Sequence, residues 1–310
     1  MQKEVLIAVD DSRHSMIAVD YAIGIHNLLK DIKFTLMHVQ PTISGYLLDE
    51  AKKSPAAYSE LEEVNRKNAG AAQALLEKYL KRMTAAGIAE SALELNTQPR
   101  ELGVAKDILQ FSMTGHFDAI IAGRRGFSGV EEIFIGSVSA NIVNNSKVIP
   151  IWLVDEQKSS KDIMVAVDGS ENALKAVDHL AFMVDGNSDV KLTFFHMMPR
   201  LKDFCPVDFE NSHAAKLEEI IRQGDKACID QFFAHAKKRL HEAKIRDSQI
   251  DFKVSERLFR VGKAVLDEYR QGNYGALVIG RRGMNKKYFT GSVSRYLINQ
   301  FSDGALWVVP

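Results

Sequence analysis

Two short stretches of this chain combine residue types and spacing suited to holding the phosphates of a nucleotide. The first runs Gly-Arg-Arg-Gly from residue 123, then nine residues, then Gly-Ser-Val-Ser from residue 136. The second runs Gly-Arg-Arg-Gly from residue 280, then seven residues, then Gly-Ser-Val-Ser from residue 291. Each follows an apolar run and precedes a segment with helical spacing. Because glycine permits close backbone approach and free N–H groups at a helix start face anions, both stretches are predicted to bind phosphate.

The two stretches belong to a duplication that covers the whole chain. The recurring pairs are Asp10 and Asp168, His38 and His196, Gly123 and Gly280, Gly136 and Gly291, and Trp152 and Trp307. Their separation is nearly constant and shrinks only across the second glycine stretch, which is the shorter one. The chain is therefore predicted to contain two copies of one domain, residues 1–157 and 162–310, joined by the polar segment 155–162. Each copy is long enough to bury its own core.

Composition indicates an ordinary globular protein. The chain has 40 basic and 40 acidic residues and is 46% hydrophobic. No basic excess points to nucleic acid, and no long apolar segment points to a membrane. Charge begins at Lys3, too early for a signal peptide. The two cysteines, Cys205 and Cys228, form no C-x-x-C pair, which favours a reducing cytoplasm. Cys228 is predicted to lie in the core, and Cys205 is the candidate for a redox-responsive thiol.

Strands and helices are predicted to alternate in each half. The first half has apolar or strand-like runs at 5–9, 34–39, 93–95, 119–122 and 148–154, and the second has matching runs at 163–167, 192–197, 252–254, 276–279 and 305–309. Ser12 and Ser170 are predicted helix caps. A long amphipathic helix is expected around 61–83 and 217–240. The fold class is therefore α/β, with a five-stranded parallel sheet and helices on both faces in each half. Ligands bind at the carboxyl ends of such strands, where Asp10, Val39 and Gly123 are expected to meet.

The glycine motif, an Asp ending the first strand, the pair His38-Val39 ending the second and a closing Pro-apolar strand resemble the universal stress proteins. The resemblance covers both halves and is closest to the tandem type, which has two such domains in one chain. It implies Rossmann-like domains of the adenine nucleotide alpha hydrolase-like kind, a cytoplasmic location and a link to stress. It also implies an adenine nucleotide ligand, ATP or its products ADP and AMP.

The resemblance assigns binding residues position by position. In the first domain they are Val9, Asp10, Val39, Gly123, Gly126, Gly136, Ser137, Val138 and Ser139. In the second, weaker site they are Asp168, Met197, Gly280, Gly283, Gly291, Ser292, Val293 and Ser294. Magnesium follows only from the chemistry of phosphate, because the sequence offers no ligand cluster for a metal.

The two copies depart from the family pattern in different places. The first has Asp11 where the second keeps Gly169, and an inward-pointing carboxylate there would repel phosphate. The second has a spacer two residues shorter, and each missing residue removes up to ~3.5 Å of reach. We expect the short spacer to be the more damaging fault, although it carries Lys286 and Lys287. The first domain is thus the predicted ATP site, and the opposite asymmetry is the competing hypothesis.

Several polar residues have two interpretations. His38 and His196 are interpreted as hydrogen-bonded packing residues, ahead of a catalytic role. Arg124 and Arg125 are interpreted as solvated, ahead of phosphate ligands. No Walker loop, kinase catalytic loop, HExxH helix or Ser-His-Asp pattern is present, so efficient catalysis is not predicted.

Three functions remain open from the sequence. The first is a nucleotide-responsive stress or regulatory module. The second is a slow ATPase or phosphoryl transferase that uses Ser137 or Ser139 with a metal. The third is an interaction scaffold without nucleotide. The two domains are also expected to pack as a pseudo-dimer through the closing segments 149–154 and 306–309, and a further homodimer of chains is left open.

Overall fold

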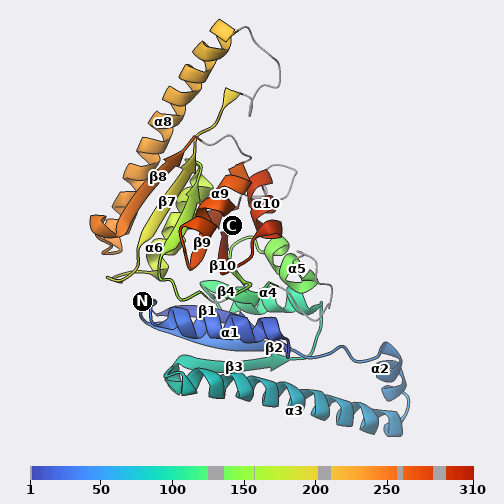
Figure 1. The fold of residues 1–310 in the computed structure, drawn as a ribbon. Coiled ribbons are helices and arrows are strands. Elements are labelled where there is room, and N and C mark those ends of the chain that lie inside the picture. Colours follow the sequence, from blue (N-terminus) through green and yellow to red (C-terminus); the bar gives the residue numbers. More distant parts are fainter. Residues whose placement is uncertain (1, 125–135, 157, 202–210, 257–260, 282–290) are drawn as a thin grey trace. The chain divides into compact units, whose positions relative to one another are not determined.

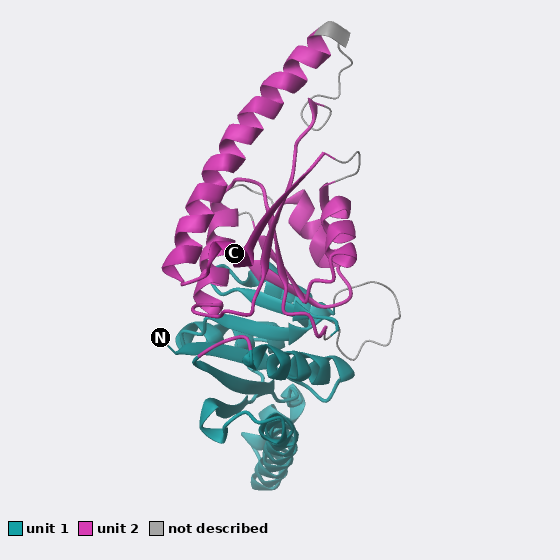
Figure 2. Ribbon diagram, turned by 60° about the vertical axis from the view of Figure 1, so that its left-hand side comes forward, with its two compact units in different colours: residues 1–27, 31–157 teal, residues 28–30, 158–310 magenta. Residues whose placement is uncertain are grey.

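The computed structural model describes residues 2–124, 136–156, 158–201, 211–256, 261–281 and 291–310 (Figure 1). The chain divides into two compact units, coloured separately in Figure 2. Unit 1 comprises residues 1–27 and 31–157, and unit 2 comprises residues 28–30 and 158–310.

Unit 1 is an α/β domain with a five-stranded sheet in the order β3-β2-β1-β4-β5. Every strand pair within it is parallel, as predicted. Its elements are β1 Lys3–Ala8, α1 Arg13–His26, β2 Ile32–Val39, α2 Gly45–Ala51, α3 Pro55–Ala85, the 3-10 turn η1 Glu90–Ala92, β3 Leu93–Gln98, α4 Val104–Thr114, β4 Ala119–Gly123, α5 Ser137–Asn145 and β5 Ile151–Val154. Helix α1 packs with α3, and α4 packs with α5.

Unit 2 repeats this arrangement with the order β8-β7-β6-β9-β10, again parallel throughout. Its elements are β6 Ile163–Val167, α6 Glu171–Met183, β7 Leu192–Met197, α8 Asn211–Glu242, the 3-10 turn η2 Asp247–Gln249, β8 Ile250–Ser255, α9 Val261–Gln271, β9 Ala276–Gly280, α10 Ser292–Gln300 and β10 Ala305–Val309. Helix α6 packs with α8, and α9 packs with α10. The predicted fold class is confirmed for both halves.

Local chemistry explains where the first helix of each unit begins. The Ser12 hydroxyl accepts from the Ser15 N–H and the Ser170 hydroxyl accepts from the Ala173 N–H, so the predicted caps are confirmed. The strands before these caps are apolar because they are covered on both faces: Val5, Leu6 and Ile7 are all 0% exposed. The centre of the sheet is therefore fully buried next to the point where the chain leaves it for the helix.

The long helices α3 and α8 are buried only over their C-terminal halves. The buried residues are Ala72, Leu76, Tyr79 and Met83 in α3, and Ile229, Phe232, Ala236 and Leu240 in α8. Figure 1 shows α3 continuing well past the ends of the strands it covers. The prediction that Cys228 lies in the core is wrong, because this thiol is exposed. It directly precedes the buried stripe of α8, which starts at Ile229.

An Arg–Asp pair fastens the long helix to the first helix in both units. Arg82 donates to both carboxylate oxygens of Asp20, at 2.5 and 2.9 Å. Arg239 pairs with Asp178 at 2.8 Å in the same place of the repeat. These pairs hold α3 against α1 and α8 against α6.

Candidate functional site

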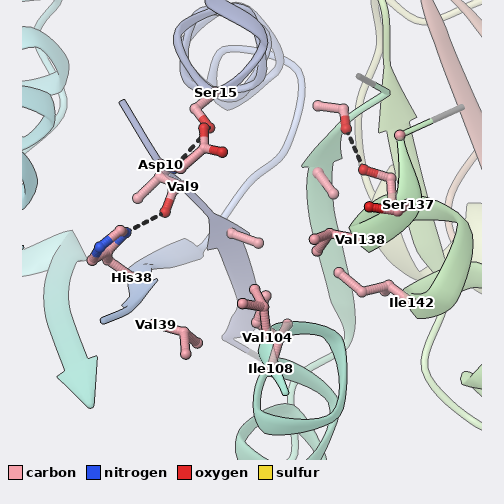
Figure 3. Close-up of a pocket in the computed structure, with 15 residues that line it drawn as sticks. Val9, Asp10, Ser15, His38, Val39, Val104, Ile108, Ser137, Val138 and Ile142 are labelled. Carbon is pink, nitrogen blue, oxygen red and sulfur yellow. Dashed lines mark hydrogen bonds between the residues drawn. The ribbon is translucent and has the colours of Figure 1, made fainter. Parts of the chain in front are cut away.

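A cavity of about 320 Å³ lies in unit 1 at the carboxyl ends of β1, β2 and β4 and at the start of α5 (Figure 3). Its size falls at the lower end of the range for small-molecule sites, about 300–1,000 Å³. The residues that line it are Ala8, Val9, Asp10, Ser15, His38, Val39, Val104, Ile108, Ala122, Gly123, Gly136, Ser137, Val138, Ser139 and Ile142.

The structure brings most of the predicted binding residues of the first domain to this one cavity. They are Val9, Asp10, Val39, Gly123, Gly136, Ser137, Val138 and Ser139. Gly126 lies outside the described residues, as do Arg125 and the spacer that follows. The shared location agrees with a common ligand, while the contacts themselves stay a prediction.

One wall of the cavity is apolar and was only partly foreseen. Val104 and Ile108, from the first turns of α4, face Val9 and Val39 across it (Figure 3), and Ile142 of α5 adds to the same lining. A wall of branched aliphatic side chains suits a flat apolar ring such as a nucleobase. The helical spacing of Val104 and Ile108 was a usable signal, since it puts both on one face.

Asp10 is held in place by hydrogen bonds around its carboxylate and backbone. Its Oδ1 atom accepts from the Ser12 N–H at 3.0 Å and from the Ser15 hydroxyl at 2.6 Å. Its backbone carbonyl accepts from the Tyr79 hydroxyl at 2.8 Å. Burial, and then the charges of Asp10 and Asp11, raise the pKa of Tyr79 to about 12, so Tyr79 remains a donor.

Asp11 does not line this cavity. Its side chain is 68% exposed and pairs with Lys78 of α3 at 3.0 Å. The carboxylate that replaces the expected glycine is thus turned toward a cation on the neighbouring helix. Asp11 therefore does not point into the cavity, where its carboxylate would repel phosphate.

At the start of α5, the described residues supply no partner for the first backbone N–H groups. Gly136 is the N-cap and supplies no side-chain cap, so the first N–H groups of the helix have no partner within it. Ser137 and Val138 are exposed at this end. The helix start is attached to the residue after β4, because the Gly136 N–H donates to Arg124 O at 2.8 Å. An uncapped helix start of this kind is suited to an anion.

Ser139 and Gly123 also make contacts that hold the fold together, which the motif alone does not indicate. The Ser139 hydroxyl donates to Gly123 O at 2.6 Å and so ties the start of α5 to the end of β4. A Cβ at Gly123 would lie 2.6 Å from His14 O, so the glycine is needed for contact with the backbone of α1. Ser294 and Gly280 repeat the hydroxyl bond at 3.0 Å, and a Cβ at Gly280 would lie 2.5 Å from Asn172 O.

The two strand-end histidines are hydrogen-bonded, as predicted. His38 Nδ1 lies 2.9 Å from Val9 O, and His196 Nδ1 lies 3.0 Å from Val167 O. His196 Nε2 also lies 2.9 Å from Asp225 Oδ2. His38 lines the first cavity, whereas His196 is absent from the lining of the second.

The solvated interpretation is wrong for Arg124, and its counterpart Arg281 is buried as well. Arg124 is 0% exposed and Arg281 is 7% exposed. Burial lowers the pKa of the Arg281 guanidinium. Neither residue lines a motif cavity. Each directly follows its strand: the Arg124 N–H donates to Val154 O, and the Arg281 N–H donates to Val309 O.

Unit 2 has a corresponding but smaller cavity, of about 120 Å³. The predicted residues Asp168, Met197, Gly280, Gly291, Ser292, Val293 and Ser294 line it, and Gly283 lies outside the described residues. Met197 stands where unit 1 has Val39, and Phe195 joins the lining. Met197 thus contributes a larger side chain to this lining than Val39 does to the first.

The turn that carries Asp168 also differs from its counterpart. Gly169 has a φ of +75°, a conformation that L side chains rarely adopt. A Cβ there would lie 2.9 Å from the sulfur of Cys228. Asp11, at the same position of the first copy, is not among the residues with positive φ. Asp168 is exposed, whereas Asp10 is half-buried.

A metal centre built from protein ligands is not found in the described part of the chain, where no group of three His, Cys, Asp or Glu residues could hold an ion. Within the same residues, no helix has the length and apolarity needed to cross a membrane.

Two parallel α/β units, each with a cavity at the strand ends and a glycine-started helix beside it, define a tandem protein of Rossmann-like α/β domains. The family model of the universal stress proteins matches residues 1–155 and again residues 159–309. The chain therefore belongs to the universal stress protein family, with two family domains in tandem.

Solved structures share this architecture over the full length. A universal stress protein from Archaeoglobus fulgidus is 19% identical, with a TM-score of 0.62, over 99% of this chain and 97% of that one. A protein of unknown function from Pseudomonas aeruginosa PAO1 is 12% identical, with a TM-score of 0.60, over 99% and 92%. No curated protein matches the sequence. At these identities the likeness establishes the fold.

Proposed function

We propose that the first domain binds ATP, or its products ADP and AMP, and that the chain acts as a nucleotide-responsive stress or regulatory module. The observation that carries the proposal is the cavity of about 320 Å³, which joins an aliphatic wall to the uncapped start of α5. The wall suits the base, and the helix start suits the phosphates. Stress linkage and a cytoplasmic location are part of the proposal and rest on family membership.

Magnesium is proposed only as the ion that accompanies the triphosphate. The described residues supply no acidic or histidine cluster for it, so most of its ligands would be phosphate oxygens and water. Ser137 is the protein group best placed to join them, because it is exposed at the start of α5 and lines the cavity.

We further propose that the second domain binds nucleotide more weakly or not at all. Its cavity of about 120 Å³ is well below the usual size of a small-molecule site, about 300 Å³ or more. The sequence-based reason was the short spacer, which lies outside the described residues. Met197 and Phe195 supply a second reason that is independent of the spacer.

Calorimetric titration of ATP into the full chain tests this proposal. We expect one tight site, which Gly136→Val abolishes because a branched side chain would fill the space before α5. Gly291→Val is the matched change in the second domain and should leave the tight site intact. If only Gly291→Val removes binding, the asymmetry runs the other way; if the unmodified chain binds no adenine nucleotide, the scaffold hypothesis is favoured.

Hydrolysis is measured on the same samples. Turnover that rises in proportion to protein and disappears in Ser137→Ala would support the phosphoryl-transfer hypothesis. Ser139 is a weaker candidate for that chemistry, because its hydroxyl proton is donated to Gly123 O. We expect ATP to be retained without appreciable turnover.

A further inference from the structure

Ser15 is a cavity residue that no family motif singles out. It is 5% exposed and lies in the first turn of α1, next to Asp10 (Figure 3). Its hydroxyl donates to Asp10 Oδ1 at 2.6 Å and accepts from the Asp10 N–H at 2.8 Å. One side chain thus fixes both the carboxylate and the backbone of the same residue.

The second unit shows that the start of the first helix does not need the hydroxyl. Ala173 stands at the position of Ser15, yet its N–H still donates to the Ser170 cap at 3.2 Å. The Ser170 N–H still donates to Asp168 Oδ1 at 3.1 Å. The helix start therefore forms with alanine, and the second unit lacks both the bond from this hydroxyl to the carboxylate and the bond from the aspartate N–H to it.

The bonds that Asp10 receives leave one carboxylate oxygen for a ligand. Ser12 N–H and the Ser15 hydroxyl both donate to Oδ1, and no described residue donates to Oδ2. Asp10 itself lines the cavity. A carboxylate that is already oriented loses less freedom when a ligand donates to it, and charge-assisted hydrogen bonds are the strong ones.

We propose that Ser15 is a positioning residue for nucleotide recognition, which orients Asp10 so that Oδ2 accepts from a donor on the adenine nucleoside. The donor is an N–H or O–H group, either the 6-amino group of adenine or a ribose hydroxyl. The proposal rests on the proposed function of the first domain. Because the second domain has Ala173 at this position, the proposal also predicts weaker nucleotide binding there.

The test is titration calorimetry on the full chain with ATP, comparing the unmodified protein with Ser15→Ala and Ser15→Thr. Ser15→Ala should weaken ATP binding about tenfold, which corresponds to about 1.4 kcal/mol. Ser15→Thr keeps the hydroxyl and should stay within about threefold of the unmodified protein on the same scale. A Ser15→Thr protein that loses as much affinity as Ser15→Ala would overturn the role of the hydroxyl.

A double-mutant cycle separates positioning from simple structural support. In an Asp10→Asn background the Ser15→Ala change should have little further effect, because the oriented carboxylate is already gone. If the two losses add in full, Ser15 does not act through Asp10 and the proposal is overturned. If the unmodified chain binds no adenine nucleotide, the proposed function fails with it; unchanged affinity in Ser15→Ala defeats the positioning role alone.

A panel of ligands identifies the donor. ATP, 2′-deoxyATP, 3′-deoxyATP and inosine triphosphate are titrated into the unmodified protein and into Ser15→Ala. The effect of Ser15→Ala should disappear for the analogue that lacks the group Asp10 accepts from. An effect of equal size with all four ligands would mean that Asp10 contacts none of these groups, which contradicts the proposal.

Discussion

Replacing Gly123 by alanine should destabilise the first domain, because the added methyl group meets backbone and not a movable side chain. The new Cβ would lie 2.6 Å from His14 O and 2.7 Å from the His14 carbonyl carbon. Real Cβ contacts are longer than 3.0 Å, so α1 or β4 must shift by several tenths of an ångström. Overpacking of this kind costs about 1–3 kcal/mol, and the rigid neighbour puts Gly123→Ala in the upper half of that range.

Differential scanning calorimetry measures the effect as a lower Tm for the first domain. A loss of about 2–3 kcal/mol corresponds to a fall of roughly 4–12 °C for a domain of this size. Gly70→Ala is the matched control, since nothing lies within 4 Å of the added Cβ in the interior of α3. It should raise stability by about 0.5–1 kcal/mol through helix propensity.

The decisive result is that Gly123→Ala lowers the Tm whereas Gly70→Ala raises it. A Gly123→Ala protein with the Tm of the unmodified chain would show that α1 can move away freely, and the close contact would then not explain this glycine. Because α1 also positions Asp10 and Ser15, we expect the same variant to weaken ATP binding. Gly70→Ala should leave ATP binding unchanged.

Three further outcomes follow from the structure. Burial lowers the pKa of His179 to about 3. In the unfolded chain this histidine has a pKa of about 6.5, so between pH 6.5 and pH 3 it is protonated in the unfolded state and neutral in the folded state. The free energy of unfolding therefore decreases as pH falls through this range, by less than about 1.4 kcal/mol per pH unit. His179→Tyr should flatten this dependence in denaturant titrations at pH 7 and pH 5, and an equal slope would contradict the burial. Asp11→Gly should change ATP affinity less than twofold, because Asp11 faces Lys78; a large gain in calorimetry would mean that its carboxylate does reach the phosphates. Met197→Val should enlarge the second cavity and raise ATP affinity there, measured in the Gly136→Val background; no gain would assign the weakness to the spacer.

The fold was predictable because its signals are local and occur twice. Apolar runs such as 5–9 and 163–167 identify strands covered on both faces, and Ser12 and Ser170 identify where helices begin. The duplication then placed the second copy by comparison with the first. Most of the predicted residues therefore meet at one cavity per unit, although each was assigned only from a motif and a strand end.

Directions of side chains were not predictable, because they depend on neighbours far away in the sequence. Asp11 is exposed and pairs with Lys78 of α3, a residue 67 positions away in the chain. Arg124 is buried although doubled basic residues in loops are usually solvated. Ser15 was not predicted, because its role depends on a hydrogen bond to Asp10 that the sequence does not show. The sequence signal was that its counterpart in the second copy is Ala173.

The hydroxyl bond from α5 to the end of β4 changes how the glycine–serine motif should be weighed in other chains. Ser139 and Ser294 make the same bond in two cavities of very different volume, so the bond does not distinguish a roomy site from a cramped one. Selection for folding alone would preserve this serine after a domain has lost its ligand. A degenerate domain can therefore keep a perfect motif, and the residues that diverge around it, such as Val39 against Met197, carry the information about what is bound.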